Sequence, residues 1–185
     1  MKRIASIILA LCLLCGCTGA EDDIGRSLRF REKMLTNGCT FIGNISANYS
    51  DRIYTFQVGC SADPDGNISF RVLSPDSISG ITGEIRAEGG FLTFDGEMLA
   101  FPLLADGEVS PVSAPWLLIH TLRSGYLSGA GMDGEYLQMV LNDSYEEDAL
   151  QVDVWLNELD QPVRADILWQ GRRILAITIE EFAFV

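Results

Sequence analysis

The chain has 185 residues, enough for one domain with a sizeable hydrophobic core. It carries 26 acidic residues against 13 lysines and arginines, a formal net charge of −13 at pH 7. Such an acidic surface repels nucleic acid and anionic lipid headgroups, so neither is expected to bind the charged surface. The charge favours a soluble, dispersed domain and leaves a basic protein partner open.

The first residues have the layout of an export signal. Met1-Lys2-Arg3 is a short basic segment, and an apolar, uncharged run over residues 4–14 follows it. This order is typical of a signal peptide, and the run is too short to span a bilayer, which takes roughly 20 apolar residues. No later stretch is long and apolar enough to be expected to cross a membrane.

The signal ends in Leu14-Cys15-Gly16-Cys17, which resembles the bacterial lipobox. The resemblance implies that Cys17 receives a diacylglyceryl group, and Cys15 stands where Ala, Ser or Thr is usual. Lipid on Cys17 would attach the chain stably to the outer face of the cytoplasmic membrane, or to an outer membrane if the source has one. The alternative is an ordinary secretory signal with an incidental cysteine.

This interpretation divides the chain into three parts. Residues 1–16 are the signal peptide, residues 17–22 are the lipid anchor with a short polar tether, and residues 23–185 are the folded domain. Loss of Lys2 and Arg3 with the signal takes the formal charge from −13 to −15.

Cys39 and Cys60 are the cysteines that follow the predicted anchor. A turn at residues 49–50 between two strands makes paired residue numbers sum to 99, which places Cys39 opposite Cys60 and Gly43 beneath Phe56. Export to an oxidising compartment favours a disulfide, which would stabilise the fold by ~3 kcal/mol. Free buried thiols are the alternative, and a redox pair lacks a Cys-x-x-Cys motif.

An amphipathic helix is expected from Asp23 to Thr36, with Asp23 as its N-cap. Ile24, Leu28 and Leu35 recur at helical spacing. We expect this helix to lie over the core of the domain.

Alternating apolar and polar residues predict antiparallel strands through most of the remaining chain. Gly89-Gly90 and Asp95-Gly96 are turn signals, and a bulge near Glu180-Glu181 reconciles two apolar faces in the last strand. The expected strands cover residues 39–47, 53–60, 68–72, 81–88, 92–94, 99–101, 137–142, 150–157, 163–170 and 174–185.

A second helix is expected from Trp116 to Ser124, ended by Gly125. Its segment Trp116-Leu117-Leu118-Ile119 is apolar almost all round, and such a helix is normally buried. Nine or ten strands around a buried helix predict a mainly β (α+β) fold. We expect one strongly curved antiparallel sheet, an incomplete β-barrel, because two flat sheets would leave the central helix uncovered.

This order of elements resembles the Lol-type lipoprotein carrier and receptor superfamily, near clostridial-type sporulation and germination lipoproteins of that fold. The resemblance implies an open half-barrel whose concave side can hold acyl chains. The stretches that carry it are Tyr54-Thr55-Phe56-Gln57-Val58-Gly59-Cys60, Phe70-Arg71-Val72-Leu73-Ser74-Pro75, Gly80-Ile81-Thr82-Gly83, Leu92-Thr93-Phe94-Asp95-Gly96 and Ser110-Pro111.

The polar motifs point to structure rather than catalysis. His120 is the only histidine, with no second base or cysteine nucleophile to complete a triad. The run Glu146-Glu147-Asp148 lies between strands, and Asp63-Pro64-Asp65-Gly66-Asn67 lacks the later ligands of a calcium loop. We therefore expect no catalytic residue, no metal site and no cofactor.

The inward-facing apolar residues are the remaining candidates for a binding site. They either line a ligand cavity or fill a dry core, because both use the same residue types. The candidates are Phe41, Ile45, Phe56, Val58, Phe70, Val72, Ile85, Phe94, Leu118, Leu122, Val152, Val154 and Ile167.

Two functions remain open. In the first, a non-enzymatic, membrane-anchored envelope lipoprotein binds an acyl chain or other apolar ligand in the concave face. In the second, the same fold is a protein-interaction scaffold that docks on an envelope or sporulation enzyme. An envelope hydrolase has no residue constellation behind it.

The anchor gives the first testable prediction. Substitution of Cys17→Ala should abolish incorporation of radiolabelled fatty acid, because the thiol that accepts the diacylglyceryl group is removed. Labelling that persists in the variant would show that another residue carries the lipid.

Overall fold

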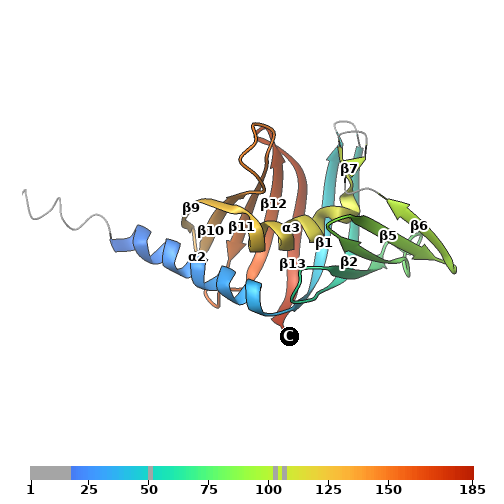
Figure 1. Cartoon of the computed structure of the whole chain (residues 1–185), viewed down its shortest axis with the longest axis horizontal. Coiled ribbons are helices and arrows are strands. Elements are labelled where there is room, and N and C mark those ends of the chain that lie inside the picture. The colour runs from blue at the N-terminus through green and yellow to red at the C-terminus, as the bar shows by residue number, and fades with distance from the viewer. Residues whose placement is uncertain (1–17, 50–51, 102–103, 106–107) are drawn as a thin grey trace, which may run out of the picture.

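The computed structural model describes residues 18–49, 52–101, 104–105 and 108–185 (Figure 1). The export signal and Cys17 lie outside this part. The elements in chain order are α2 (Thr18–Thr36), β1 (Cys39–Tyr49), β2 (Arg52–Ala62), β3 (Ile68–Ser74), β4 (Thr82–Arg86), β5 (Gly89–Phe94), β6 (Glu97–Phe101), β7 (Leu104–Ala105), β8 (Glu108–Val109), the 3-10 turn η1 (Pro111–Ser113), α3 (Ala114–Ser124), β9 (Tyr126–Asp133), β10 (Tyr136–Asn142), β11 (Leu150–Leu156), β12 (Pro162–Trp169) and β13 (Arg172–Phe184).

Eleven strands form a single antiparallel sheet in the order β6-β5-β4-β3-β2-β1-β13-β12-β11-β10-β9. Consecutive strands pair from β1 to β6 and from β9 to β13, and β1 pairs with β13, so the first and last strands lie together in the middle of the sheet. Strands β7 and β8 pair with each other in a separate two-stranded sheet. Within the described chain β6 and β9 end the sheet and do not pair with each other, so it is not closed. The predicted mainly β fold with an open curved sheet and two helices is confirmed.

The first hairpin differs from the predicted register by two residues. Cys39 pairs with Ala62 rather than with Cys60, because β1 and β2 extend until Tyr49 pairs with Arg52 and the connection lies one residue further along. A shift of two residues keeps every side chain on its predicted face of the sheet, since the strand period is two.

Glycines lie beneath aromatic rings, but at other positions than predicted. Gly43 faces Val58 instead of Phe56. Gly83 lies under the ring of Phe70 and Gly90 under that of Phe101. Gly90 is therefore a strand residue of β5, and the predicted turn at Gly89-Gly90 is wrong.

Two local predictions in the sheet are confirmed. Asp95 and Gly96 connect β5 to β6 with φ values of 49° and 83°, the positive φ values that a tight hairpin turn needs. In β13 the register against β1 shifts between Thr40 and Ile42, and Glu181 has a φ of 51°. The bulge therefore lies where the two apolar faces of the strand change over.

Helix α2 begins earlier than expected. It begins at Thr18, so residues 18–22 are helical instead of an extended tether, and Asp23 lies inside the helix instead of capping it. The Asp23 carbonyl accepts a hydrogen bond from Ser27 Oγ at 2.8 Å, in the i to i+4 relation of a continuous helix. Neither described helix is long and apolar enough to cross a membrane.

The buried face of α2 is also not the predicted one. Phe30 and Met34 are buried, together with Ser27, whereas Leu28 and Leu35 are exposed. Phe30 packs between Phe182 and Phe184 at ring-centroid distances of 6.4 and 6.1 Å. Large aromatic side chains at the end of β13 thus decide which face of the helix is buried.

Helix α3 crosses the inner face of the sheet, with α2 beside it (Figure 1). Its N-terminal half is entirely buried, and Leu118, Ile119 and Leu122 are at most 1% exposed. The prediction of a buried central helix is confirmed, including its end before Gly125. Helix α3 is therefore part of the hydrophobic core.

The Gly83–Phe70 contact gives a prediction on stability. A Cβ at position 83 would lie 2.6 Å from Phe70 Cζ and 2.7 Å from the carbonyl oxygen of Phe91. Gly83→Ala should therefore lower the free energy of unfolding by about 1–3 kcal/mol in urea denaturation. Gly131→Ala in β9 is the control, because nothing lies within 4 Å of its Cβ position. Equal stability of the two variants would contradict the packing described here.

Candidate binding site

The inner face of the sheet is filled by side chains. Of the thirteen predicted candidates, eleven are buried in one continuous core cluster, and Phe56 is partly buried against it. Phe94 has the predicted inward parity, that of Leu92, but it lies next to the turn of the β5–β6 hairpin and is 48% exposed. The buried eleven are Phe41, Ile45, Val58, Phe70, Val72, Ile85, Leu118, Leu122, Val152, Val154 and Ile167.

Two arginines fix the C-terminal end of α3 in this position. Arg31 of α2 donates from Nε to the carbonyl oxygen of Leu122 at 2.8 Å and from Nη2 to that of Gly125 at 2.5 Å. Arg123 of α3 donates to the carbonyl oxygens of Met34 and Pro64. Burial lowers the pKa of Arg31, and its carbonyl partners keep its guanidinium turned into the protein.

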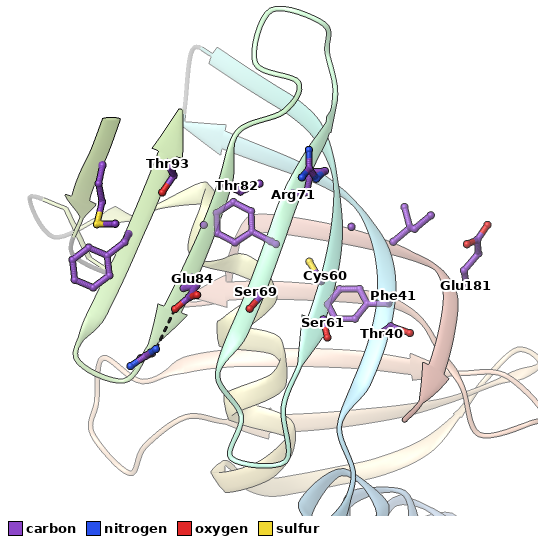
Figure 2. A pocket seen from close by; sticks show the side chains of 17 residues that line it. Thr40, Phe41, Cys60, Ser61, Ser69, Arg71, Thr82, Glu84, Thr93 and Glu181 are labelled. Carbon is purple, nitrogen blue, oxygen red and sulfur yellow. Dashed lines mark hydrogen bonds and ion pairs between the residues drawn. The ribbon is translucent and has the colours of Figure 1, made fainter. Parts of the chain in front are cut away.

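The opposite, outer face of the same sheet carries a groove of about 790 Å³ over β1 to β6 (Figure 2). Side chains of two neighbouring cross-strand rows line it, and both rows have the parity that points away from α3. The first row is Thr40, Ser61, Ser69, Glu84 and Phe91, and the second is Ile42, Gly59, Arg71, Thr82, Thr93 and Met98.

The lining of the groove combines apolar surface with one unpaired cation. Phe91 and Met98 form its apolar end, and Ile42 lies at the other end. Arg71 lies over the middle strand, and no ion pair to it is found among the described residues. A guanidinium beside apolar surface is suited to a carboxylate flanked by apolar groups.

The groove continues into an exposed hairpin. Strand β6 is the edge of the sheet, and within the described chain only β5 pairs with it. Met98 on the groove side is 69% exposed and Leu99 on the inner side is 65% exposed. An edge strand with unpaired backbone groups and apolar side chains on both faces is a template for pairing with another chain.

Our sequence reasoning considered the inward apolar face and missed this outer site. The sequence held a signal for it. Phe91 and Met98 are apolar, and so are their chain neighbours Leu92 and Leu99, which point to the other face of the sheet. A strand with apolar side chains on both faces exposes one of these faces to solvent unless something covers it, and the core covers only the inner face.

The other sequence candidates have structural roles. His120 stacks on Trp116 with ring centroids 4.5 Å apart, and burial lowers its pKa while Asp143 opposes the shift. Asp63 Oδ1 accepts hydrogen bonds from the backbone N–H groups of Asp65 and Asn67, which confirms a turn. No group of three His, Cys, Asp or Glu side chains in the described residues is placed to hold a metal.

Cys39 and Cys60 are free, buried thiols in the structure. The observed register makes them diagonal neighbours on the inner face, since Cys60 pairs with Phe41. Burial raises the pKa of Cys39 to about 11, against a smaller opposing effect of Arg123, and burial also raises that of Cys60. The sequence argument for a disulfide placed the two cysteines directly opposite each other, whereas the observed register places them diagonally. The disulfide stays a prediction.

Comparisons with known proteins found neither a matching family model nor a matching curated protein. Among solved structures, a DUF1329 family protein from Desulfovibrio piger has a TM-score of 0.49 at 9% identity, over 90% of this chain and 93% of that chain. A LolA superfamily protein from Nitrosomonas europaea has a TM-score of 0.45 at 8% identity, over 86% and 93%.

The lipoprotein LppX from Mycobacterium tuberculosis has a TM-score of 0.43 at 10% identity, over 87% of this chain and 93% of that chain. One of these neighbours, the protein from Nitrosomonas europaea, is named for the LolA superfamily, which the order of elements in this sequence resembles. At these identities the similarity concerns the arrangement of the fold alone.

The two thiols give a prediction on redox state. Protein isolated from the envelope, denatured and alkylated, should gain mass at Cys39 and Cys60 only after reduction, as a disulfide requires. In the reduced, folded protein both thiols should react slowly near pH 8, because their raised pKa values keep them protonated. Alkylation of both residues without prior reduction would refute the disulfide.

Proposed function

We propose that this chain is a non-enzymatic binding protein, tethered to the cell envelope through lipid on Cys17, that holds an extended segment of a partner protein. The segment would lie in the outer-face groove and pair with the free edge of β6. The observation that carries this proposal is the contrast between the two faces of the sheet. The inner face is occupied by α3, whereas the outer face carries an open groove.

The filled inner face favours the scaffold hypothesis over an acyl-chain carrier. Leu118 and Leu122 are buried in the same core cluster as Val152 and Ile167. An acyl chain could enter only by displacing them. The free energy needed is large, because each of these side chains contributes roughly 1.5–3 kcal/mol by its burial.

The edge strand and the groove together define how a partner segment would bind. An added strand would hydrogen-bond to the free backbone groups of β6, and its side chains would alternate between the two faces of the sheet. Those on the outer face would meet Met98 and Phe91, which are exposed in the described structure. Arg71 is on β3, four strand spacings or roughly 19 Å from a strand added to β6, so a carboxylate would reach it only on a part of the segment that turns into the groove. The preferred segment is therefore apolar with an acidic residue.

The anchor and the groove suit each other. Lipid on Cys17 would hold the domain at the outer surface of a membrane, where other envelope proteins present extended segments. The acidic net charge limits unspecific contact with anionic lipids, so specific apolar and backbone contacts would select the partner.

Photo-cross-linking in intact cells tests the site. A photoreactive amino acid at Met98 should give one discrete protein adduct, and the same residue at Leu159 should not. Leu159 is a matched control because it is 77% exposed and lies on the turn after β11, away from the groove. Adducts of equal yield at both positions, or none at Met98, would overturn the proposal.

The affinity of the purified partner for charge variants tests the chemistry. Arg71→Glu should weaken binding by about tenfold or more, because loss of a charge-assisted contact and a new repulsion both act on the carboxylate. Arg29→Glu makes the same charge change on the exposed side of α2 and should leave the affinity unchanged. An equal loss in both variants would indicate only long-range electrostatics.

Acyl-chain binding on the inner face is the second candidate, favoured by one feature of α3. Thr121 Oγ1 is buried and has no hydrogen-bond partner among the described residues, which weakens the docking of this helix by about 1–3 kcal/mol. Native mass spectra of the unlipidated chain from Thr18, offered phospholipid, test it. A lipid adduct that persists in the groove variant Met98→Asp would assign the ligand to the inner face, and a clean protein mass would exclude it.

A further inference from the structure

Helix α2 has a second apolar row in addition to its buried face. Ile24 is 44% exposed, and Leu28 and Leu35 are each 52% exposed. At 3.6 residues per turn, positions 24, 28 and 35 fall within about 40° of one another around the helix axis. The buried row of Phe30 and Met34 lies about 120° away by the same count. The exposed residues therefore form a separate stripe, which the core does not use.

The one charged residue within this row is turned into the protein. Arg31 lies between Leu28 and Leu35 in the row, and its guanidinium donates to backbone carbonyls at the end of α3. The exposed cations Arg29 and Lys33 lie on the other side of the helix. The surface of the row is therefore largely apolar, and about half of each of its three apolar side chains is exposed.

The position of the predicted anchor identifies what covers this row. Helix α2 begins at Thr18, directly after Cys17, and Ile24 follows Cys17 by seven residues, two helical turns. At 1.5 Å per residue, Ile24 lies about 9 Å and Leu35 about 26 Å along the helix from Thr18. A rigid helix of this length, unlike a flexible tether, would hold the apolar row close to the bilayer that takes up the lipid.

We propose that the row formed by Ile24, Leu28 and Leu35 is a membrane-contact face, and that α2 lies along the bilayer surface. Amphipathic helices of this kind bury their apolar face about 5–10 Å into the boundary between headgroups and acyl chains. The occupant is the lipid surface itself rather than a second copy of the chain. This inference rests on the Cys17 anchor and is independent of the groove.

Because the domain is acidic, contact should be closest on a zwitterionic bilayer. Glu32 is exposed beside the row, and the whole chain carries a formal charge of −13. Anionic lipid would repel this charge within a Debye length of about 8 Å at physiological salt. The apolar side chains, and not the charges, would therefore hold the helix on the surface.

A fluorophore whose emission reports a lipid environment tests the proposal on the mature lipoprotein. NBD would be attached at Leu28→Cys and, as the matched control, at Lys33→Cys on the far side of the same helix. Cys39 and Cys60 are buried and slow to react, and the unsubstituted protein measures their background labelling. Each protein would be reconstituted into phosphatidylcholine vesicles with and without doxyl-labelled lipid.

The expected result is a blue shift with about a twofold rise in NBD emission at position 28, quenched by doxyl lipid, and no change at position 33. No change at position 28, or an equal change at both positions, would overturn the proposal. A change at position 28 that doxyl lipid does not quench would indicate a protein contact and overturn it as well.

A second preparation separates failure of the anchor from failure of the contact face. The chain from Thr18, preceded by a histidine tag, can be held on vesicles by nickel-chelating lipid without any lipid on Cys17. The same NBD response is expected there, because the helix would still lie against the bilayer. If the tagged chain responds and the mature chain does not, only the anchor is wrong.

Discussion

The burial of α3 inside the curve of the sheet is the constraint on which the rest of the structure depends. The helix is apolar almost all round, so it is stable only when side chains surround it, and an open sheet supplies them from strands on both sides of the β1–β13 junction. The same packing explains why Arg31 and Arg123 donate to backbone carbonyls at this end of the fold. They satisfy helix and turn carbonyls that the apolar surroundings would otherwise leave without partners.

Because helix α3 covers the inner face of the sheet, the outer face and the edges are the parts of the sheet open to other molecules. The outer face of β1 to β6 forms the groove, and β6 ends the sheet with apolar side chains on both sides. Natural edge strands are usually protected by charged residues, proline or bulges. Strand β6 carries Met98 and Leu99 instead, and Glu97 is its only charged residue. An unprotected edge beside an apolar groove is better explained by a partner that covers it than by packing within the chain.

Much of this fold follows from the sequence, and the misses have definable physical causes. The buried central helix, the Asp95-Gly96 hairpin and the bulge at Glu181 were predicted because local patterns determine them. The register of the first hairpin was wrong by two residues because both choices put the same side chains inward, so the apolar pattern cannot separate them. Strand β9 was missed because Gly129 and Gly131 interrupt its alternation. The groove was missed because the pairing of β3 to β6 brings Arg71, Phe91 and Met98 to one face, and that pairing is a property of the assembled sheet.

The choice of buried face on α2 shows how tertiary packing can override a helical pattern and leave an apolar row exposed. Ile24, Leu28 and Leu35 have the better apolar spacing, yet Phe30 is buried because Phe182 and Phe184 at the end of β13 surround it. The row left outside then continues toward the predicted lipid on Cys17. Helix α2 packs on the inner side of the sheet, whereas the groove opens on the outer side. A domain held to the membrane by α2 would therefore keep its groove clear of the helix that anchors it, and a partner segment could reach β6 without displacing either.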